Sequence, residues 1–66
     1  MFEEFYVSET EMENYSENDI DRFNLYLEER LTEMNLDPER DSELVAKEAK
    51  HLVNMYLTSD PEEWPF

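Results

Sequence analysis

The apolar residues of this chain recur at helical spacing in two segments, of which the first begins at Ser16. Its repeat follows intervals of three, four, four and three residues through Ile20, Phe23, Leu27, Leu31 and Met34. This period predicts an amphipathic helix from Ser16 to Met34. Ser16 has the side chain of an N-cap, and the acids behind it suit the positive end of a helix dipole. Asn35 is expected to stop the helix before Asp37-Pro38, where the backbone must extend or turn.

The second segment predicts a helix from Asp41 to Leu57, capped by Asp41 or Ser42. At about 100° per residue, one stripe is formed by Val45, Ala49, Leu52 and Tyr56. More apolar residues flank this stripe: Ala46, Val53 and Leu57 on one side, and Leu44 and Met55 on the other. The resulting arc is wider than one partner helix covers, which predicts that another part of the chain packs on it.

Both ends of the chain carry aromatic residues that suit this role. Phe2, Phe5, Tyr6 and Val7 form an apolar cluster too short to stand alone, and the tail ends in Trp64-Pro65-Phe66. Further expected features are a capping box of Ser8 and Glu11, a short helical face of Met12 and Tyr15, and one helical turn starting at Pro61 behind Ser59 or Asp60. Helix, strand and disorder all stay open for the arm as a whole.

These elements predict an all-α fold, a small antiparallel helical hairpin with an N-terminal arm and a C-terminal aromatic tail packed on it. The arm comprises residues 1–15, the hairpin residues 16–57 and the tail residues 58–66. A chain of 66 residues forms one domain at most, and its stability is expected to be marginal. It contains no cysteine, so no disulfide or thiolate metal site contributes. No apolar run reaches the ~20 residues of a membrane span, and we expect a soluble, cytoplasmic protein.

Charge changes this picture more than any motif does. Nineteen acids oppose five bases, for a formal net charge of −14. The acids are concentrated at the start, because residues 1–21 carry eight of them and no base. Such a one-sided field repels nucleic acid and anionic membranes and attracts basic protein surfaces. We therefore expect a basic protein partner, with no direct binding of nucleic acid or membrane.

The sequence gives little support for a catalytic site or a metal site. Asp37, Glu39, Asp41, Glu43 and Glu48 have the spacing of a calcium loop. Ser42 stands where that loop needs glycine and Pro38 occupies its second place, so we favour an interhelix turn followed by N-cap acids. His51 lies between Lys47 and Lys50 on the polar strip of the second helix, where a solvated side chain is expected. We predict no enzyme, no catalytic residue, no metal and no cofactor.

Two functional hypotheses follow from the charge and from the apolar surplus. In the first, the protein is a small non-enzymatic inhibitor that occupies the basic cleft of a nucleic-acid-binding protein by DNA mimicry, as small acidic helical proteins of phages and mobile elements do. It resembles that class in size and charge, although no motif defines the class. A viral origin would place it in the host cytoplasm. The predicted partner-binding residues are Glu9, Glu11, Glu13, Glu17, Asp21, Glu28, Glu29 and Trp64.

The alternative hypothesis is a protein-interaction adaptor or dimerisation module. Here the contact is made by the apolar flank of the second helix and by the Trp64-Pro65-Phe66 tail inserted into a partner's groove. The tail rings have an equally simple role in sealing the protein's own core. A homodimer through the second helix is a further possibility. Dependence of binding on salt separates the hypothesis based on charge from the one based on an apolar groove.

Overall fold

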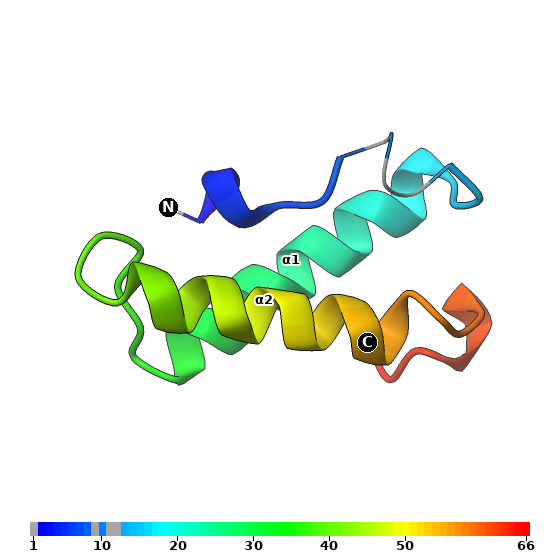
Figure 1. Ribbon diagram of the computed structural model, residues 1–66. Helices are drawn as coiled ribbons and strands as arrows, with labels where there is room; N and C mark the ends of the chain where they lie inside the picture. The colour runs from blue at the N-terminus through cyan, green and yellow to red at the C-terminus, as the bar shows by residue number, and fades with distance from the viewer. Residues whose placement is uncertain (1, 9, 11–12) are drawn as a thin grey trace.

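The computed structural model describes residues 2–8, 10 and 13–66. Two α-helices, α1 (Glu17–Glu33) and α2 (Ser42–Tyr56), lie side by side as an antiparallel hairpin (Figure 1). Each end of the chain adds a short 3-10 turn, η1 (Glu3–Phe5) before the hairpin and η2 (Pro61–Glu63) after it. The predicted all-α helical hairpin with an N-terminal arm is confirmed.

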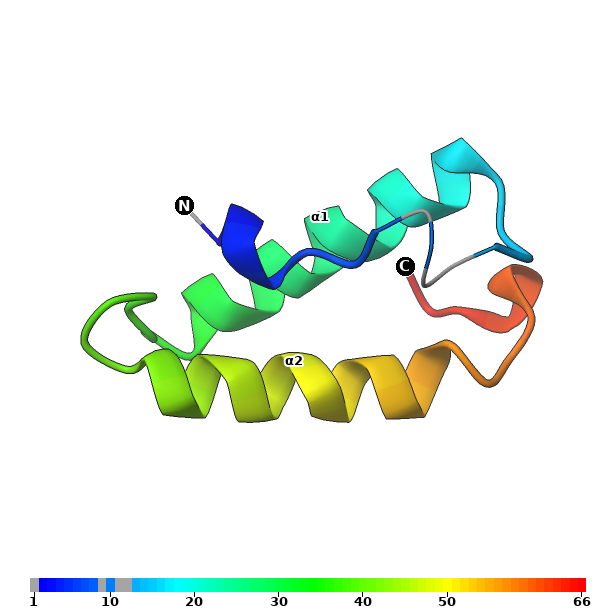
Figure 2. The ribbon, with the colours of Figure 1, turned by 45° about the horizontal axis from the view of Figure 1, so that its top comes forward.

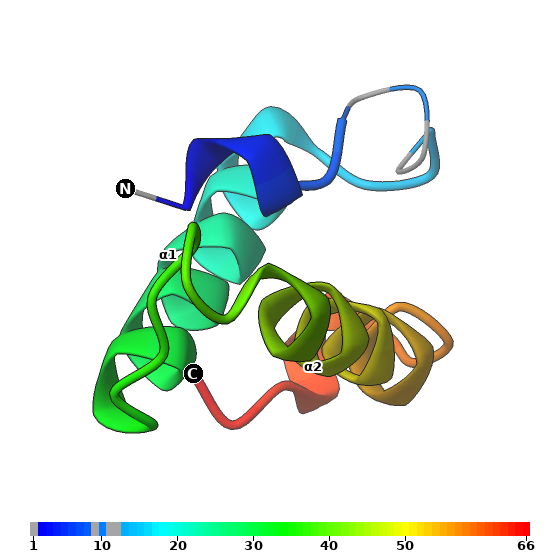
Figure 3. The ribbon, with the colours of Figure 1, turned by 60° about the vertical axis from the view of Figure 1, so that its left-hand side comes forward.

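The arm and the tail pack on opposite sides of the hairpin. Figure 2 shows the arm running beside α1, with the end of the tail returning between the helices. A view closer to the helix axes places the arm over one side of the hairpin and the end of the tail on the other (Figure 3). The two helices therefore gain cover from both directions.

Helix α1 has caps at both ends that explain its length. The Ser16 hydroxyl accepts a hydrogen bond from the Asp19 backbone N–H at 3.3 Å. At the other end Asn35 adopts a left-handed backbone with φ of 56°. Its N–H bonds to the Thr32 carbonyl at 3.0 Å, and the Leu36 N–H bonds to the Leu31 carbonyl at 3.2 Å. This pair of bonds is a Schellman motif, which confirms Asn35 as the stop.

Helix α2 begins differently. Asp41 occupies its N-cap position, but the side chain makes no cap hydrogen bond. The Asp41 carboxylate accepts instead from the Asp37 backbone N–H at 3.1 Å. The carboxylate therefore closes the interhelix turn, and only the predicted position of the cap, not its side-chain bond, is found.

The core is made by both helices and both ends of the chain. Most of the predicted helical stripes are buried, and Leu52 is 2% exposed. Met34 differs, at 43% exposed, because it is the C-cap residue at the edge of the hairpin. The arm and the tail supply three of the buried side chains, Phe2, Val7 and Trp64. The buried set is Phe2, Val7, Ile20, Phe23, Leu27, Leu31, Val45, Ala49, Leu52 and Trp64.

Within the described part of the chain, neither helix combines the length and the apolar character that crossing a bilayer requires.

Candidate interaction surface

The polar surface of α1 has two flanks of different charge. At about 100° per residue, Glu17, Asp21, Asn24 and Glu28 align along one edge of the buried stripe. Both arginines of the helix, Arg22 and Arg30, fall toward the opposite edge. We call the first edge the acidic flank, comprising Glu17, Asp21, Asn24 and Glu28. It contains no base.

The N-terminal arm is fastened along this acidic flank. The Asn24 side chain binds both polar groups of the Val7 backbone: its oxygen accepts from the N–H at 3.0 Å and its nitrogen donates to the carbonyl at 3.4 Å. One turn further on, the Tyr6 hydroxyl donates to the Glu28 carboxylate at 3.0 Å. Asn24 thus holds the arm as a neighbouring strand would, and the ring of Tyr6 covers part of the flank.

The pKa of Tyr6 is changed by this contact. Burial of the ring and its hydrogen bond to Glu28 raise the pKa of Tyr6 to about 12. The phenol therefore stays protonated, and it remains a donor to the Glu28 carboxylate at neutral pH.

The opposite flank of α1 is neutralised and sealed by the tail. Arg22 pairs with Asp19 at 3.2 Å and donates to the main-chain oxygen of Phe66. Its guanidinium carbon lies 5.4 Å from the centre of the Trp64 ring, in cation–π geometry. Phe66 stacks on Tyr26 with ring centres 4.0 Å apart. The positive charge of Arg22 on this flank is thus offset by the Asp19 carboxylate and lies against the aromatic rings of the tail.

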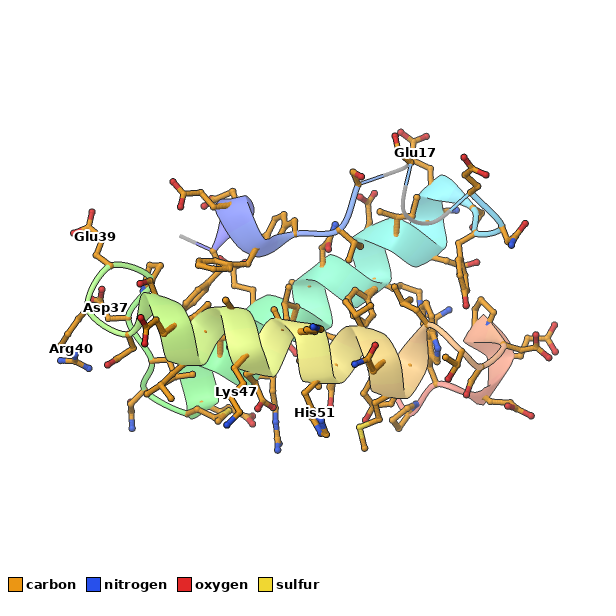
Figure 4. All side chains as sticks on the ribbon, in the orientation of Figure 1. Glu17, Asp37, Glu39, Arg40, Lys47 and His51 are labelled. Carbon is orange, nitrogen blue, oxygen red and sulfur yellow. The ribbon has the colours of Figure 1, made fainter. Side chains whose placement is uncertain are left out.

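The predicted partner-binding residues fall into three groups. Glu13, Glu17, Asp21 and Glu29 are exposed, and Figure 4 shows Glu17 on the arm side of the molecule. Glu28 is half-buried beneath Tyr6. Glu9 and Glu11 lie outside the described residues, as do the Ser8–Glu11 capping box and the Met12 half of the expected helical face.

Trp64 belongs to the protein's own core. It is 7% exposed, and its indole N–H donates to the Tyr56 carbonyl at 2.8 Å. Its ring stacks on Tyr15 and also contacts Phe23 and Phe66. Of the two roles open to the tail rings, the structure shows the sealing one. Insertion into a partner would first require the tail to unpack.

The interhelix turn directs its carboxylates to its own backbone. One Asp37 oxygen accepts from the N–H groups of Glu39 and Arg40, at 2.8 and 2.9 Å. These bonds lower the pKa of Asp37, and the Arg40 guanidinium lowers the pKa of Asp41. Glu39 points outward in Figure 4. Among the described residues no three acids, histidines or cysteines converge as metal ligands would.

Two open hollows mark the surface near α1. One, of about 280 Å³, lies on the acid-bearing outer face of α1 and is lined by Glu28, Glu29, Thr32 and Glu33. The other, of about 610 Å³, lies between the start of α1 and η2 and is lined by Asn14, Ser16, Asp19, Arg22, Asp60, Pro61 and Glu62. In the described part of the chain no polar or charged side chain is fully buried. Neither hollow therefore has the dry, polar interior that strongly shifts the pKa of a catalytic group.

Sequence reasoning missed the polar contacts that set the position of the arm and the tail. Asn24 gave only a weak signal, because asparagine is a poor helix former at an interior position. Tyr15 gave no signal for its actual bonds, which run from its hydroxyl to the carbonyls of Leu57 and Ser59 at 3.0 and 3.1 Å.

No protein-family model, curated protein or solved structure matches this chain.

Proposed function

We propose that this protein is a non-enzymatic inhibitor that binds the basic cleft of a nucleic-acid-binding protein by presenting its acidic flank in place of DNA. The observation that carries the proposal is the absence of any base along Glu17, Asp21 and Glu28, while Arg22 is held on the opposite flank by Asp19 and the tail. The proposed site of action is the cytoplasm, of a host cell if the protein is viral.

The charge density of α1 supports this role. The helix carries six acids, Glu17, Asp19, Asp21, Glu28, Glu29 and Glu33. Its 17 residues extend about 25 Å, which gives one acid per ~4 Å, against one phosphate per ~3.4 Å along a single DNA strand. Carboxylates one turn apart, such as Glu17 and Asp21, are separated by ~5–6 Å. Of these six acids the acidic flank presents Glu17, Asp21 and Glu28, so a cleft that binds phosphates would meet carboxylates at intervals of one to two helical turns.

The rest of the molecule supports a binding role for charge rather than for the tail. The exposed acids Glu13, Glu17, Asp21 and Glu29 are free of any packing duty in the apolar core. Trp64, in contrast, is needed inside that core. We propose the exposed acids as the contact residues, together with Glu9 and Glu11, which precede Glu13 in the sequence.

The test compares two variants of equal charge. The flank variant combines two changes on the acidic flank, Glu17→Gln and Asp21→Asn, with changes at the two other exposed contact acids, Glu13→Gln and Glu29→Gln. The control variant combines Glu39→Gln, Glu43→Gln, Glu62→Gln and Glu63→Gln, four exposed acids elsewhere on the surface. Each immobilised protein is offered the heparin-binding fraction of a lysate of its source cells, which is enriched in basic nucleic-acid-binding proteins. Circular dichroism verifies that both variants keep their helices.

We expect the parent and the control variant to retain one basic nucleic-acid-binding protein that the flank variant loses. Added salt and added duplex DNA are each expected to release it, because screening weakens the attraction and DNA competes for the same cleft. Retention by all three proteins in high salt would contradict the proposal. It would favour the adaptor hypothesis, whose exposed apolar residues are Leu44 and Met55 on α2.

A further inference from the structure

Helix α2 carries a polar and apolar stripe on its outer surface, in which Leu44, His51 and Met55 are exposed and Glu48 is half-buried. Leu44, Glu48, His51 and Met55 follow one another at four, three and four residues, so they align along one edge of the helix. The two apolar ends of this stripe, Leu44 and Met55, are 55% and 53% exposed. In Figure 4 His51 points away from the arm, to the side of the molecule opposite Glu17.

The spacing of this stripe is the same when the helix is read backwards. Reversal about the point midway between Ala49 and Lys50 exchanges Leu44 with Met55 and Glu48 with His51. We propose that the stripe is the contact surface of a symmetric homodimer, in which the α2 helices of two copies pack antiparallel across a two-fold axis at that point. Leu44 then faces Met55 of the partner subunit, and Glu48 faces the partner subunit's His51.

Chemical complementarity identifies the occupant as a second copy of this chain. A two-fold contact must match a surface with its own reversed image. Here each apolar residue meets an apolar residue, and each carboxylate meets an imidazole that can donate a hydrogen bond to it. A partner with an unrelated helix would need the same order of apolar, acidic, basic and apolar residues, which a second copy supplies by symmetry.

The location of the stripe also minimises repulsion between copies. Although the chain carries a net charge of −14, α2 is formally neutral, because Lys47 and Lys50 offset Glu43 and Glu48. Glu17, at the start of the acidic flank of α1, lies on the side of the molecule opposite His51 (Figure 4). Two copies that meet through α2 therefore keep their most acidic surfaces apart, and each acidic flank stays accessible in the dimer.

This arrangement has a salt dependence opposite to that of the proposed inhibitor function. Long-range repulsion between two acidic copies is screened as the Debye length falls from ~8 Å at ~0.15 M salt to ~3 Å at ~1 M. The apolar contacts of Leu44 and Met55 are not weakened by this screening. Dimerisation is thus expected to strengthen with salt, whereas binding to a basic protein weakens. The homodimer proposal does not rest on the inhibitor function.

Sedimentation equilibrium of the full chain over a concentration series, at both salt levels, tests the proposal. We expect a reversible monomer–dimer equilibrium whose dimer fraction rises with salt. Met55→Ser is expected to weaken association by roughly tenfold or more, because two-fold symmetry removes the apolar contact twice. The matched control is Leu25→Ser, which changes a side chain that is 58% exposed on α1 and is expected to leave association unchanged.

A charge exchange makes the test specific for the register. His51→Glu places two carboxylates opposite each other at two positions and is expected to abolish the dimer. Adding Glu48→Lys to His51→Glu restores opposite charges across the axis and is expected to restore association. A parent protein that sediments as a monomer throughout would overturn the proposal. So would a dimer that tolerates both Met55→Ser and His51→Glu, or a double variant that stays monomeric while keeping its helical circular dichroism.

Discussion

The arm and the tail close the same apolar core by different chemistry. The arm buries two side chains, Phe2 and Val7, and is positioned through its backbone by Asn24. The tail is held mainly by rings, with Trp64 and Phe66 packed among Tyr15, Phe23 and Tyr26. The arm is thus held by hydrogen bonds to its backbone, whereas the tail is held by the packing of its aromatic side chains.

The two flanks of α1 that the arm and the tail cover differ in charge as well as in structure. The aromatic tail lies on the flank of α1 that carries Arg22, and it shares that cation with Asp19. The arm lies on the flank without a base, where the neutral phenol of Tyr6 donates to Glu28. The acids of α1 on the arm side therefore have no neighbouring base, because Arg22 and Arg30 fall toward the other flank.

Removing the central ring of the tail is expected to have the largest effect. Trp64→Ala leaves a cavity among Tyr15, Phe23 and Phe66, and the expected loss is about 3–5 kcal/mol of unfolding free energy. That approaches the full stability of a small domain. Urea denaturation followed by circular dichroism measures the loss. Leu25→Ala, at a side chain that is 58% exposed, is the control and is expected to change stability by less than about 0.5 kcal/mol. Equal stability of Trp64→Ala and the parent would show that the tail does not seal the core.

A smaller effect is expected when the arm loses its clamp. Asn24→Ala leaves the N–H and carbonyl of Val7 without their partner, while alanine improves helix propensity. The expected net loss is about 1–2 kcal/mol. Chymotrypsin, which cuts after aromatic residues, is expected to cleave after Phe5 or Tyr6 faster than in the parent. Asn54→Ala on the exposed face of α2 gives the gain in propensity without the loss. If cleavage rates are equal in all three proteins, Asn24 does not hold the arm.

The smallest effect concerns Tyr6 and depends on pH. Because its pKa is raised from 10.0 to about 12 in the folded protein, the neutral phenol is favoured by folding. Its contribution is fully present below about pH 10 and is lost as the pH rises toward 12. Tyr6→Phe is expected to cost about 0.5–1 kcal/mol at neutral pH, since the bond is only part-buried. Melting curves of both proteins across this range are expected to converge at high pH, and a constant difference would refute the link to Glu28.

The helices were predictable from the sequence because their signals are local. The apolar period, the Ser16 cap and the Asn35 stop all act within a few residues of each other, and both helices agree with the predicted ranges to within their cap residues. Met34 fits the apolar period but is exposed, because it lies at the edge of the hairpin. The period alone does not show where the neighbouring helix ends.

The contacts of the two ends were not predictable in the same way. Asn24 and Val7 are separated by 17 residues, and Tyr15 and Ser59 by 44. No local pattern announces such pairs, because each depends on how the finished hairpin presents its edges. The sequence left Trp64 with two roles for the same reason, and only packing distinguishes a ring that seals a core from one that binds a partner. The partner-binding role of the exposed acids stays a proposal, because the exposure of a side chain does not identify the molecule that binds it.

The Tyr15 hydroxyl, bonded to the carbonyls of Leu57 and Ser59, has a consequence for the order of folding. Helices form and a short hairpin closes within microseconds, whereas a contact between residues more than 40 positions apart must wait for a large loop to close. Tyr15 joins the start of the hairpin to its end, so its hydrogen bonds are expected to form last. In native-state hydrogen exchange, the amides of the arm and tail are then the first to open, and those of α1 and α2 around Leu27 and Leu52 the last.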